Sequence, residues 1–111
     1  MKNYVQPGNT ITLTAPYAVV SGDGLLVGSI FGVAAGSAAL GETVEASLVG
    51  VFDLKKVASQ AWAAGDKVYW DNTNKEATQT ATANTLIGIA TEAVAGGAGD
   101  VIGRVRLNGS F

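Results

Sequence analysis

Residues 43–54 read TVEASLVGVFDL, and this stretch decides the fold class. Apolar and polar side chains that alternate with a period of two mark a strand with one buried face. One face carries the apolar residues Val44, Ala46, Leu48, Phe52 and Leu54. The opposite face carries Thr43, Glu45, Ser47 and Asp53, with Val49 and Val51 among them. Gly50 interrupts the apolar face, which predicts a bend or a bulge at that point.

Short strands of the same kind are predicted along the rest of the chain. They cover residues 10–15, 25–33, 67–71, 75–80, 86–94 and 101–107. The segment 25–33 is apolar on both faces and is predicted as a strand buried on both sides, whereas 75–80 is predicted as an edge or solvent-facing partner of 67–71. Turn residues about every ten positions predict an all-β fold, a small sandwich or barrel of about seven short strands.

One short helix is predicted over residues 56–64. Val57, Ala58, Ala61 and Trp62 recur at helical spacing and would share one face. Gly65 follows as a plausible C-terminal cap. A helix of about two turns needs tertiary support to form, so we expect it to pack on the sheets.

The length and the turn signals predict the domain organisation. A chain of 111 residues is long enough for one modest core and too short for two domains. Residues 1–9 contain the turn signal Pro7-Gly8 and are predicted as an extended N-terminal arm. Residues 10–111 are predicted as a single β domain, and no internal repeat is visible in the sequence.

The composition argues against catalysis and against cofactor or metal binding. The chain has no His and no Cys, so it lacks the usual general base, thiol nucleophile and soft metal ligands. No Gly-Lys pair is present to form a phosphate-binding loop. The run Asp71-Asn72-Thr73-Asn74 lacks the later glycine and glutamate of a calcium loop, and it is interpreted as a hairpin turn. An enzyme would therefore need two carboxylates that face a common cleft.

The charge pattern argues against nucleic acid and membrane as partners. The net charge is −2 and the seven basic residues are scattered, whereas nucleic-acid binding depends on clustered phosphate contacts. The apolar stretch 25–35 is too short to span a bilayer, and the N-terminus lacks the apolar run of a signal peptide. These features predict a soluble protein made in a cytoplasm. Only 14% of the residues are charged, which fits either a surface covered by a partner or one rich in Thr, Ser and Asn.

The aromatic residues divide into two groups. Trp62 and Trp70 lie on apolar faces and are predicted to pack in the core. Tyr4 and Phe111 lie in the terminal segments, where exposed aromatics could anchor a neighbouring subunit. The candidate partner-binding residues are Tyr4, Val5, Gln6, Pro7 and Phe111. No catalytic, cofactor-binding or metal-binding residue is predicted.

Taken in order, several short motifs resemble a family of small phage capsid cement or decoration proteins, which are often classed as a domain of unknown function. The motifs are NYVQPGNT at 3–10, SGDG at 21–24, VG at 27–28, GVFDL at 50–54, AGDKVYWD at 64–71, LIGIA at 86–90 and VRLNG at 105–109. Some members have been labelled recombinase-like, an activity that requires the phosphate loop this chain lacks.

The resemblance implies a non-enzymatic head decoration protein. Such a protein would bind the major capsid protein on the outside of the assembled shell and stabilise it through contacts between subunits. It would be made in the bacterial host cytoplasm and would act as a homo-oligomer, with dimer and trimer both open. The alternative is a carbohydrate- or ligand-binding β module of a phage tail or surface accessory, which an exposed Trp70 beside Asp71 and Asn72 would favour.

Overall fold

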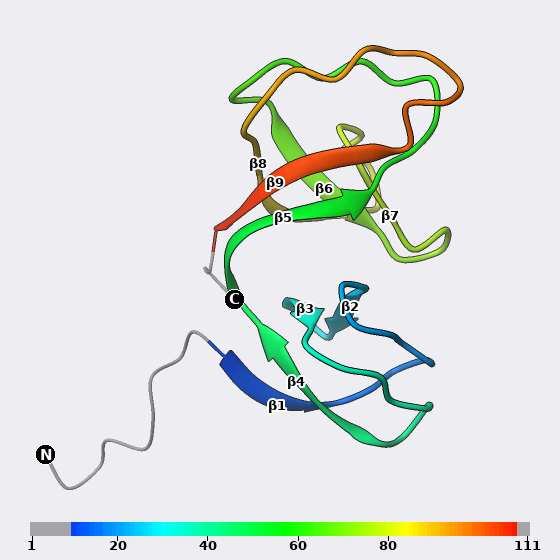
Figure 1. Ribbon diagram of the computed structural model, residues 1–111, viewed down its shortest axis with the longest axis vertical. Coiled ribbons are helices and arrows are strands. Elements are labelled where there is room, and N and C mark those ends of the chain that lie inside the picture. The colour runs from blue at the N-terminus through cyan, green and yellow to red at the C-terminus, as the bar shows by residue number, and fades with distance from the viewer. Residues whose placement is uncertain (1–9, 109–111) are drawn as a thin grey trace, which may run out of the picture.

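The computed structural model describes residues 10–108, and these residues form nine β-strands and no helix (Figure 1). The predicted all-β class is therefore confirmed, with nine strands in place of about seven. The described residues thus contain no helix that could cross a bilayer. The strands are β1 (Thr10–Thr14), β2 (Gly24–Val27), β3 (Ile30–Ala34), β4 (Thr43–Ser47), β5 (Val49–Lys55), β6 (Lys67–Asp71), β7 (Glu76–Thr78), β8 (Thr85–Ala90) and β9 (Ile102–Asn108).

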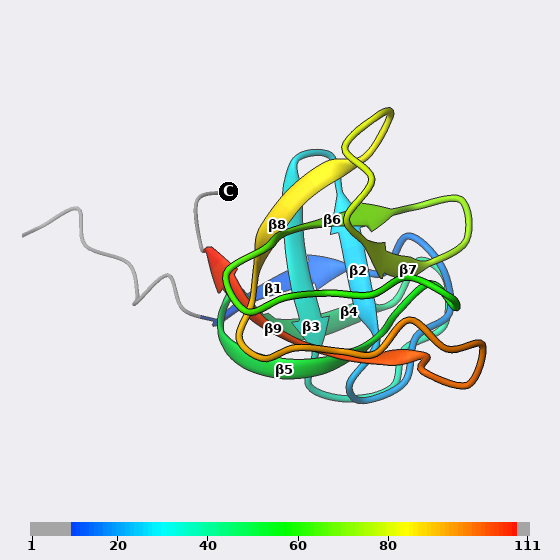
Figure 2. The same ribbon diagram turned by 90° about the horizontal axis from the view of Figure 1, so that it is seen from above.

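The strands form two antiparallel sheets stacked on one another (Figures 1 and 2). Sheet 1 has the order β1-β4-β3-β2, and sheet 2 has the order β5-β9-β8-β6-β7. The two ends of sheet 2 approach each other, because Lys56, directly after β5, pairs in parallel with Ala77 of β7. Sheet 2 is therefore a half-barrel whose open side faces sheet 1.

Two predicted strands are each divided in two. The stretch 43–54 breaks at Leu48, where the chain leaves sheet 1 as β4 and enters sheet 2 as β5. The predicted bend thus lies two residues before Gly50, although Gly50 itself has a φ of +122°. The apolar segment 25–33 is a hairpin, because Gly28 adopts a φ of +60° and makes a two-residue turn with Ser29.

The predicted edge strand at 75–80 is shorter and more buried than expected. It is reduced to β7, which is the last strand of sheet 2, so its edge position is confirmed. Its side chains do not face solvent, however, since Ala77 and Thr78 are both buried. The approach of β5 to this edge, through the pairing of Lys56 with Ala77, explains the burial.

The predicted helix at 56–64 is wrong. Lys56 pairs with Ala77 of β7, and Trp62 pairs with Val94 through reciprocal backbone hydrogen bonds of 3.0 Å. These long-range bonds hold the segment extended, and Ser59 has a φ of +60° that no α-helix accepts. A two-turn helix has too little local stability to compete with such pairing.

Four turns share the pattern x-x-Gly-Asp/Glu. They occupy residues 20–23, 39–42, 63–66 and 97–100. In each, the carboxylate of the fourth residue accepts a hydrogen bond from the backbone N–H of the first, over 2.7–3.0 Å. The carboxylates of Asp23, Asp66 and Asp100 therefore stabilise turns, a role that is common for Asp beside glycine.

The structure reveals an internal repeat that the sequence did not show. The first repeat is residues 10–47, and its four strands β1 to β4 form a sheet in the order β1-β4-β3-β2. The second repeat, residues 49–108, has the same order when β5, β6, β8 and β9 take the places of β1, β2, β3 and β4. Strand β7 is an insertion between β6 and β8. The two repeats retain one short sequence similarity, which is Phe31-Gly32-Val33-Ala34 in the first and Ile87-Gly88-Ile89-Ala90 in the second.

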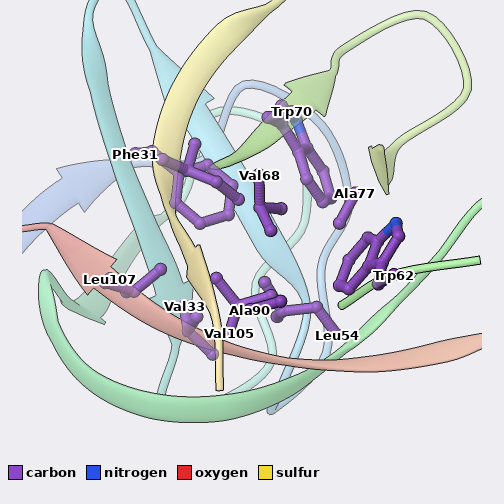
Figure 3. Packing of buried hydrophobic residues seen from close by; sticks show 11 residues of the cluster. Phe31, Val33, Leu54, Trp62, Val68, Trp70, Ala77, Ala90, Val105 and Leu107 are labelled. Atoms are coloured by element: carbon purple, nitrogen blue, oxygen red, sulfur yellow. The ribbon is translucent and has the colours of Figure 1, made fainter. Parts of the chain in front are cut away.

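Each repeat has its own hydrophobic cluster, and the first repeat also completes the second (Figure 3). Phe31 and Val33 project from β3 into the cluster of sheet 2, where the rings of Phe31 and Trp70 lie 4.9 Å apart. Trp62 and Trp70 are only 3% and 2% exposed, so their predicted core positions are confirmed. The outer side of the β2–β3 hairpin thus closes the half-barrel of the second repeat.

Candidate functional site

Sheet 2 exposes a mixed apolar and basic surface on the side away from its core, here called the outer face. Burial alternates along β9, where Gly103, Val105 and Leu107 are buried and the residues between them are exposed. Strands β5 and β8 flank β9 on its two sides. The outer face comprises Val49, Val51, Asp53 and Lys55 of β5, Ile89 of β8, and Ile102, Arg104 and Arg106 of β9.

The centre of the outer face is a row of three side chains across three strands. Val51 of β5 and Ile89 of β8 both pair with Arg106 of β9. Val51 is 53% exposed and Ile89 is 38% exposed, whereas inward-facing Val105 is fully buried. Arginine is enriched at protein–protein interfaces, and the centre of such an interface is more apolar than the rest of the surface.

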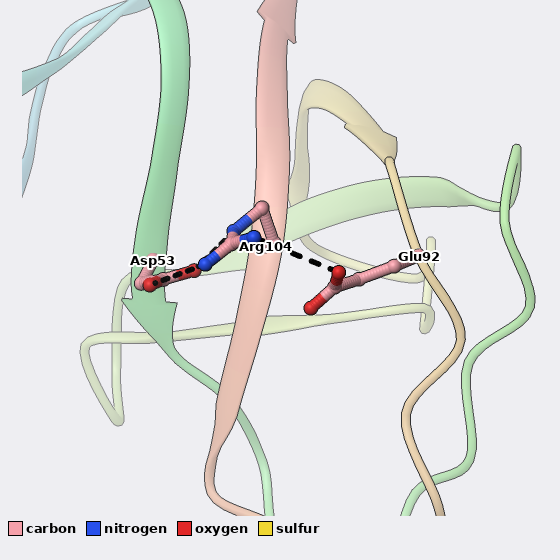
Figure 4. A network of polar contacts seen from close by, with 3 residues as sticks. All are labelled: Asp53, Glu92 and Arg104. Atoms are coloured by element: carbon pink, nitrogen blue, oxygen red, sulfur yellow. Dashed lines mark hydrogen bonds and ion pairs between the residues drawn. The ribbon is translucent and has the colours of Figure 1, made fainter.

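The next row along β9 carries a network of charges (Figure 4). Arg104 donates two hydrogen bonds to the Asp53 carboxylate, of 2.9 Å from Nε and 3.2 Å from Nη2. Its Nη1 also lies 3.6 Å from Oε2 of Glu92. The hydrogen bonds from Arg104 hold the pKa of Asp53 below its ordinary value, and the same contacts raise the pKa of Arg104. The charge of Arg104 is therefore compensated within the protein.

We expect Asp53 to titrate below its ordinary pKa of 3.8 in an NMR titration of the side-chain carboxyl. A carboxyl whose pKa is lowered by folding contributes stability above its unfolded pKa, and this contribution is lost as the pH falls through the folded value. The effect on stability is small because the pair is exposed. In Arg104→Gln the midpoint should rise toward 3.8, and an unchanged midpoint would show that the pair does not form in solution.

Arg106 differs from Arg104 in its surroundings. Between residues 10 and 108, no carboxylate lies within ion-pair distance of its guanidinium. Its neighbours across the strands are Val51 and Ile89. A guanidinium with unused donors between aliphatic side chains is well suited to a carboxylate or a carbonyl of a partner.

The predicted site residues Tyr4, Val5, Gln6, Pro7 and Phe111 lie outside the described residues, as does the predicted arm 1–9. The structure does place the points where both terminal segments begin. Thr10 pairs with Ser47 and Asn108 pairs with Val49, so the two attachment points flank Leu48. Both segments therefore attach beside the end of the outer face that carries Val49.

A hollow of about 280 Å³ lies between the two repeats and is lined by Tyr17, Asp23, Lys55, Trp70 and Lys75, among others. The Tyr17 hydroxyl donates a hydrogen bond of 2.6 Å to the carbonyl of Gly24, and Lys75 Nζ lies 4.3 Å from the centre of the Tyr17 ring. Burial, with a smaller contribution from Asp23, raises the pKa of Tyr17 to about 12. The contact of Lys75 with Tyr17 thus joins the second repeat to the first at this hollow.

The residues considered for a glycan site, Trp70, Asp71 and Asn72, have other contacts in the structure. Trp70 is buried, and its indole N–H donates to Asn72 over 3.2 Å. Asp71 accepts hydrogen bonds from the backbone N–H groups of Thr73 and Asn74, which lower its pKa. The interpretation of residues 71–74 as a hairpin turn is therefore confirmed.

Sequence reasoning missed the outer face, although a signal for it was present. Val49 and Val51 interrupt the polar face of the stretch 43–54, and Ile102 alternates with Arg104 and Arg106 in the last strand. Apolar residues on the solvent side of two strands point to one surface only if the strands are adjacent. The pairing of β5 with β9 supplies that adjacency.

Comparison with known proteins gives one result. A family model described as phage cement protein matches residues 5–107, which is nearly the whole chain. No curated protein and no solved structure matches. The matched region includes the first repeat, the second repeat as far as Leu107, and all of the outer face.

Proposed function

The chain belongs to the phage cement protein family, whose members are structural proteins of the virion capsid, and from this premise we propose that it binds the exterior of the assembled head and stabilises the shell. It acts by bridging neighbouring copies of the major capsid protein and without catalysis. The observation that carries the proposal is the exposed row Val51–Arg106–Ile89 at the centre of the outer face.

Two properties of the outer face favour a docking role: its composition, and the rigid strands on which its side chains stand. Its exposed side chains stand on three paired strands, with a packed core directly beneath them. A rigid surface loses little side-chain and backbone freedom on binding, which favours affinity. The compensated pair of Arg104 and Asp53 leaves Arg106, at the centre of the outer face, available to a partner.

The terminal segments supply the second part of the proposed interface. We assign capsid contacts to Tyr4, Val5, Gln6 and Pro7 of the arm 1–9 and to Phe111, with residues 10–111 as a single β domain that presents them. Their attachment points flank Leu48 beside Val49. An arm that adds a strand to a sheet edge of one coat subunit, while the outer face contacts another, would join the two subunits.

Such bridging stabilises the shell by mass action. A ligand that binds the assembled, expanded head, and not the free coat subunits, shifts the equilibrium toward the assembled state. Many copies on one head add their contributions, and contacts to two subunits from one molecule raise the effective concentration of the second contact. The protein is made in the host cytoplasm, where it meets newly assembled heads.

Co-sedimentation tests the proposal directly. Purified protein should pellet with expanded, unoccupied heads and remain in the supernatant with unexpanded heads, because only the expanded lattice presents the bridged site. Occupied heads should also resist heating or chelation better than bare heads. Equal binding to both head forms, or no binding to either, would contradict the proposal.

Deletion of residues 2–8 in the same assay measures how much the arm contributes to binding the heads. We expect a lower occupancy and a faster loss of protein on dilution, since one of the two contacts is removed. A matched control is Leu40→Ser, which changes an exposed apolar residue in a turn of the first repeat. Unchanged occupancy after the deletion would reject the role of the arm and leave the outer face as the docking site.

A further inference from the structure

We propose that the hollow between the two repeats, here called the junction hollow, is a second docking site and takes an acidic side chain of the major capsid protein. The inference rests on the proposed function and deepens it, because it names the kind of side chain that the partner supplies. The hollow has a volume of about 280 Å³ and is lined by residues of both repeats. Ligand pockets begin at about 300 Å³, so this hollow suits a single side chain.

Contacts between the repeats fix the walls of the junction hollow. The Tyr17 hydroxyl donates a hydrogen bond of 2.6 Å to a backbone carbonyl of β2, and Lys75 Nζ lies 4.3 Å from the centre of the Tyr17 ring. Leu54 and Trp70 are each 2% exposed and line the bottom of the hollow. A Cβ at Gly22 would meet no atom within 4 Å, so the rim is open on that side. A site that is formed before binding loses little freedom when it is occupied.

The charge of the junction hollow favours an anion. Its lining carries two cations, Lys55 and Lys75, and one carboxylate, Asp23. Among the described residues, neither lysine lies within ion-pair distance of a carboxylate. The carboxylates nearby bind their own turns instead, since Asp23 accepts a hydrogen bond of 3.0 Å from the N–H of Val20, and Asp71 accepts two from the backbone of the β6–β7 turn. An acidic side chain would therefore meet uncompensated positive charge.

Both lysines have unused hydrogen-bond donors. A lysine ammonium has three, and Lys75 Nζ donates to the backbone carbonyl of Asn72 and lies 3.4 Å from the side-chain oxygen of the same residue. At least one donor of Lys75 is therefore left. Lys55 is exposed, and within residues 10–108 its ammonium has no partner. A carboxylate that accepts from both lysines would use these donors in charge-assisted hydrogen bonds, which are stronger than neutral ones.

The junction hollow adjoins the outer face, which identifies the coat protein as the source of the side chain. Lys55 belongs to both surfaces, because it is the last residue of β5 and also lines the hollow. The terminal segments attach beside Val49, the first residue of β5, so the hollow lies at the opposite end of this strand, about 20 Å away. A coat subunit that covers the row Val51–Arg106–Ile89 can therefore reach the hollow along β5.

A small-molecule probe tests the hollow in the absence of heads. N-acetylglutamate N-methylamide carries one carboxylate, and N-acetylglutamine N-methylamide is its neutral isostere. In NMR spectra of the full chain, the glutamate probe should shift the backbone signals of Gly22 and Lys55 and the indole signal of Trp70, with half-saturation at about 10 mM. The glutamine probe should bind about tenfold more weakly, because it leaves both lysines uncompensated. Equal shifts with the two probes, or no saturable shift, overturns the inference.

Lysine variants then locate the site of probe binding. Lys55→Gln should weaken binding of the glutamate probe about tenfold, through the loss of one charge-assisted contact. Lys67→Gln is the matched control, since it removes the charge of an exposed lysine on β6, outside the junction hollow, and should bind the probe like wild type. Equal weakening in the two variants would mean that only the overall charge matters, and would refute the site.

The same site is tested on expanded heads with Lys55→Gln/Lys75→Gln. This variant should bind heads about tenfold more weakly than wild type, and its melting curve shows whether it is folded. Unchanged binding would exclude the hollow from the capsid interface and leave the outer face as the docking site. Failure of the wild-type protein to bind any head would contradict the proposed function and the partner named here, whereas a saturable shift with the glutamate probe would still establish a carboxylate site.

Discussion

Gly88→Ala should lower the free energy of unfolding by more than about 4 kcal/mol, a large part of the total. A Cβ at Gly88 would lie 2.0 Å from the carbonyl oxygen of Arg106, on the neighbouring strand β9. Neither backbone can withdraw, because Gly88 pairs with Leu107 on one side and with Val68 on the other. Such a clash belongs to the rare substitutions that cost more than about 4 kcal/mol. A domain of this size has a total stability of about 5–15 kcal/mol.

The internal repeat provides graded controls for this experiment. Gly32 occupies the equivalent position in the first repeat, where a Cβ would meet the Cβ of Ala46 at 2.9 Å and the carbonyl oxygen of Ser47 at 3.2 Å. Gly36 has open space, so Gly36→Ala should change stability by no more than about 0.5 kcal/mol. Urea denaturation should rank the losses as Gly88→Ala, then Gly32→Ala, then Gly36→Ala. A Gly88→Ala variant as stable as the wild type would contradict the close packing of β8 on β9.

Local patterns in the sequence predicted the parts of the fold that local interactions determine. The alternation in 101–107 predicted β9 to within one residue, and the predicted core positions of Trp62 and Trp70 are confirmed. The Gly-Asp pairs gave turns, because an Asp side chain can accept a hydrogen bond from a nearby backbone N–H. These features depend on side chains within a few residues of each other.

The parts that the sequence did not predict depend on contacts between distant residues. Residues 56–64 have helical spacing, but their pairing with Ala77 and Val94 decides their conformation. The repeat is hidden because only one short motif retains its sequence, and because strand β7 is inserted in one copy.

Lys56 is the clearest example of a residue that local patterns misplace. Beside Lys55 it resembles one of a pair of surface cations, yet its side chain is 1% exposed. Its Nζ donates a hydrogen bond of 2.6 Å to the carbonyl of Val57 and lies 5.7 Å from the centre of the Trp62 ring. A buried cation requires such partners, and only the tertiary structure brings Trp62 to it. The equivalent residue in the first repeat is Ala15.

The candidate site was predictable to a smaller extent. The predicted residues lie in the terminal segments, outside residues 10–108, and their role stays a prediction. The outer face required the order of the strands in sheet 2, because Val51, Arg106 and Ile89 come from segments far apart in the chain. Sequence alone places Val51 on the polar face of its strand, where a single exposed aliphatic side chain has no special meaning, and it assigns no face to Ile89.

Val51→Thr/Ile89→Thr should abolish stable binding to expanded heads while the protein remains folded. Threonine retains the β-branched shape that suits a strand, so the melting temperature should stay close to that of wild type. The substitutions remove apolar contacts on both sides of Arg106, at the centre of the outer face. Loss of an interface anchor costs about 2 kcal/mol, or about thirtyfold in affinity for each anchor.

Val20→Thr/Leu40→Thr is the matched control, since Val20 and Leu40 are 57% and 70% exposed and lie in turns of the first repeat. It removes a comparable amount of exposed apolar surface away from the outer face and should bind heads like wild type. Arg106→Gln, which removes only the charge, should fall between the two because the aliphatic neighbours remain. Full occupancy by Val51→Thr/Ile89→Thr would exclude the outer face from the capsid interface. The terminal segments would then have to supply the whole of the binding energy, and deletion of residues 2–8 would become the stronger of the two perturbations.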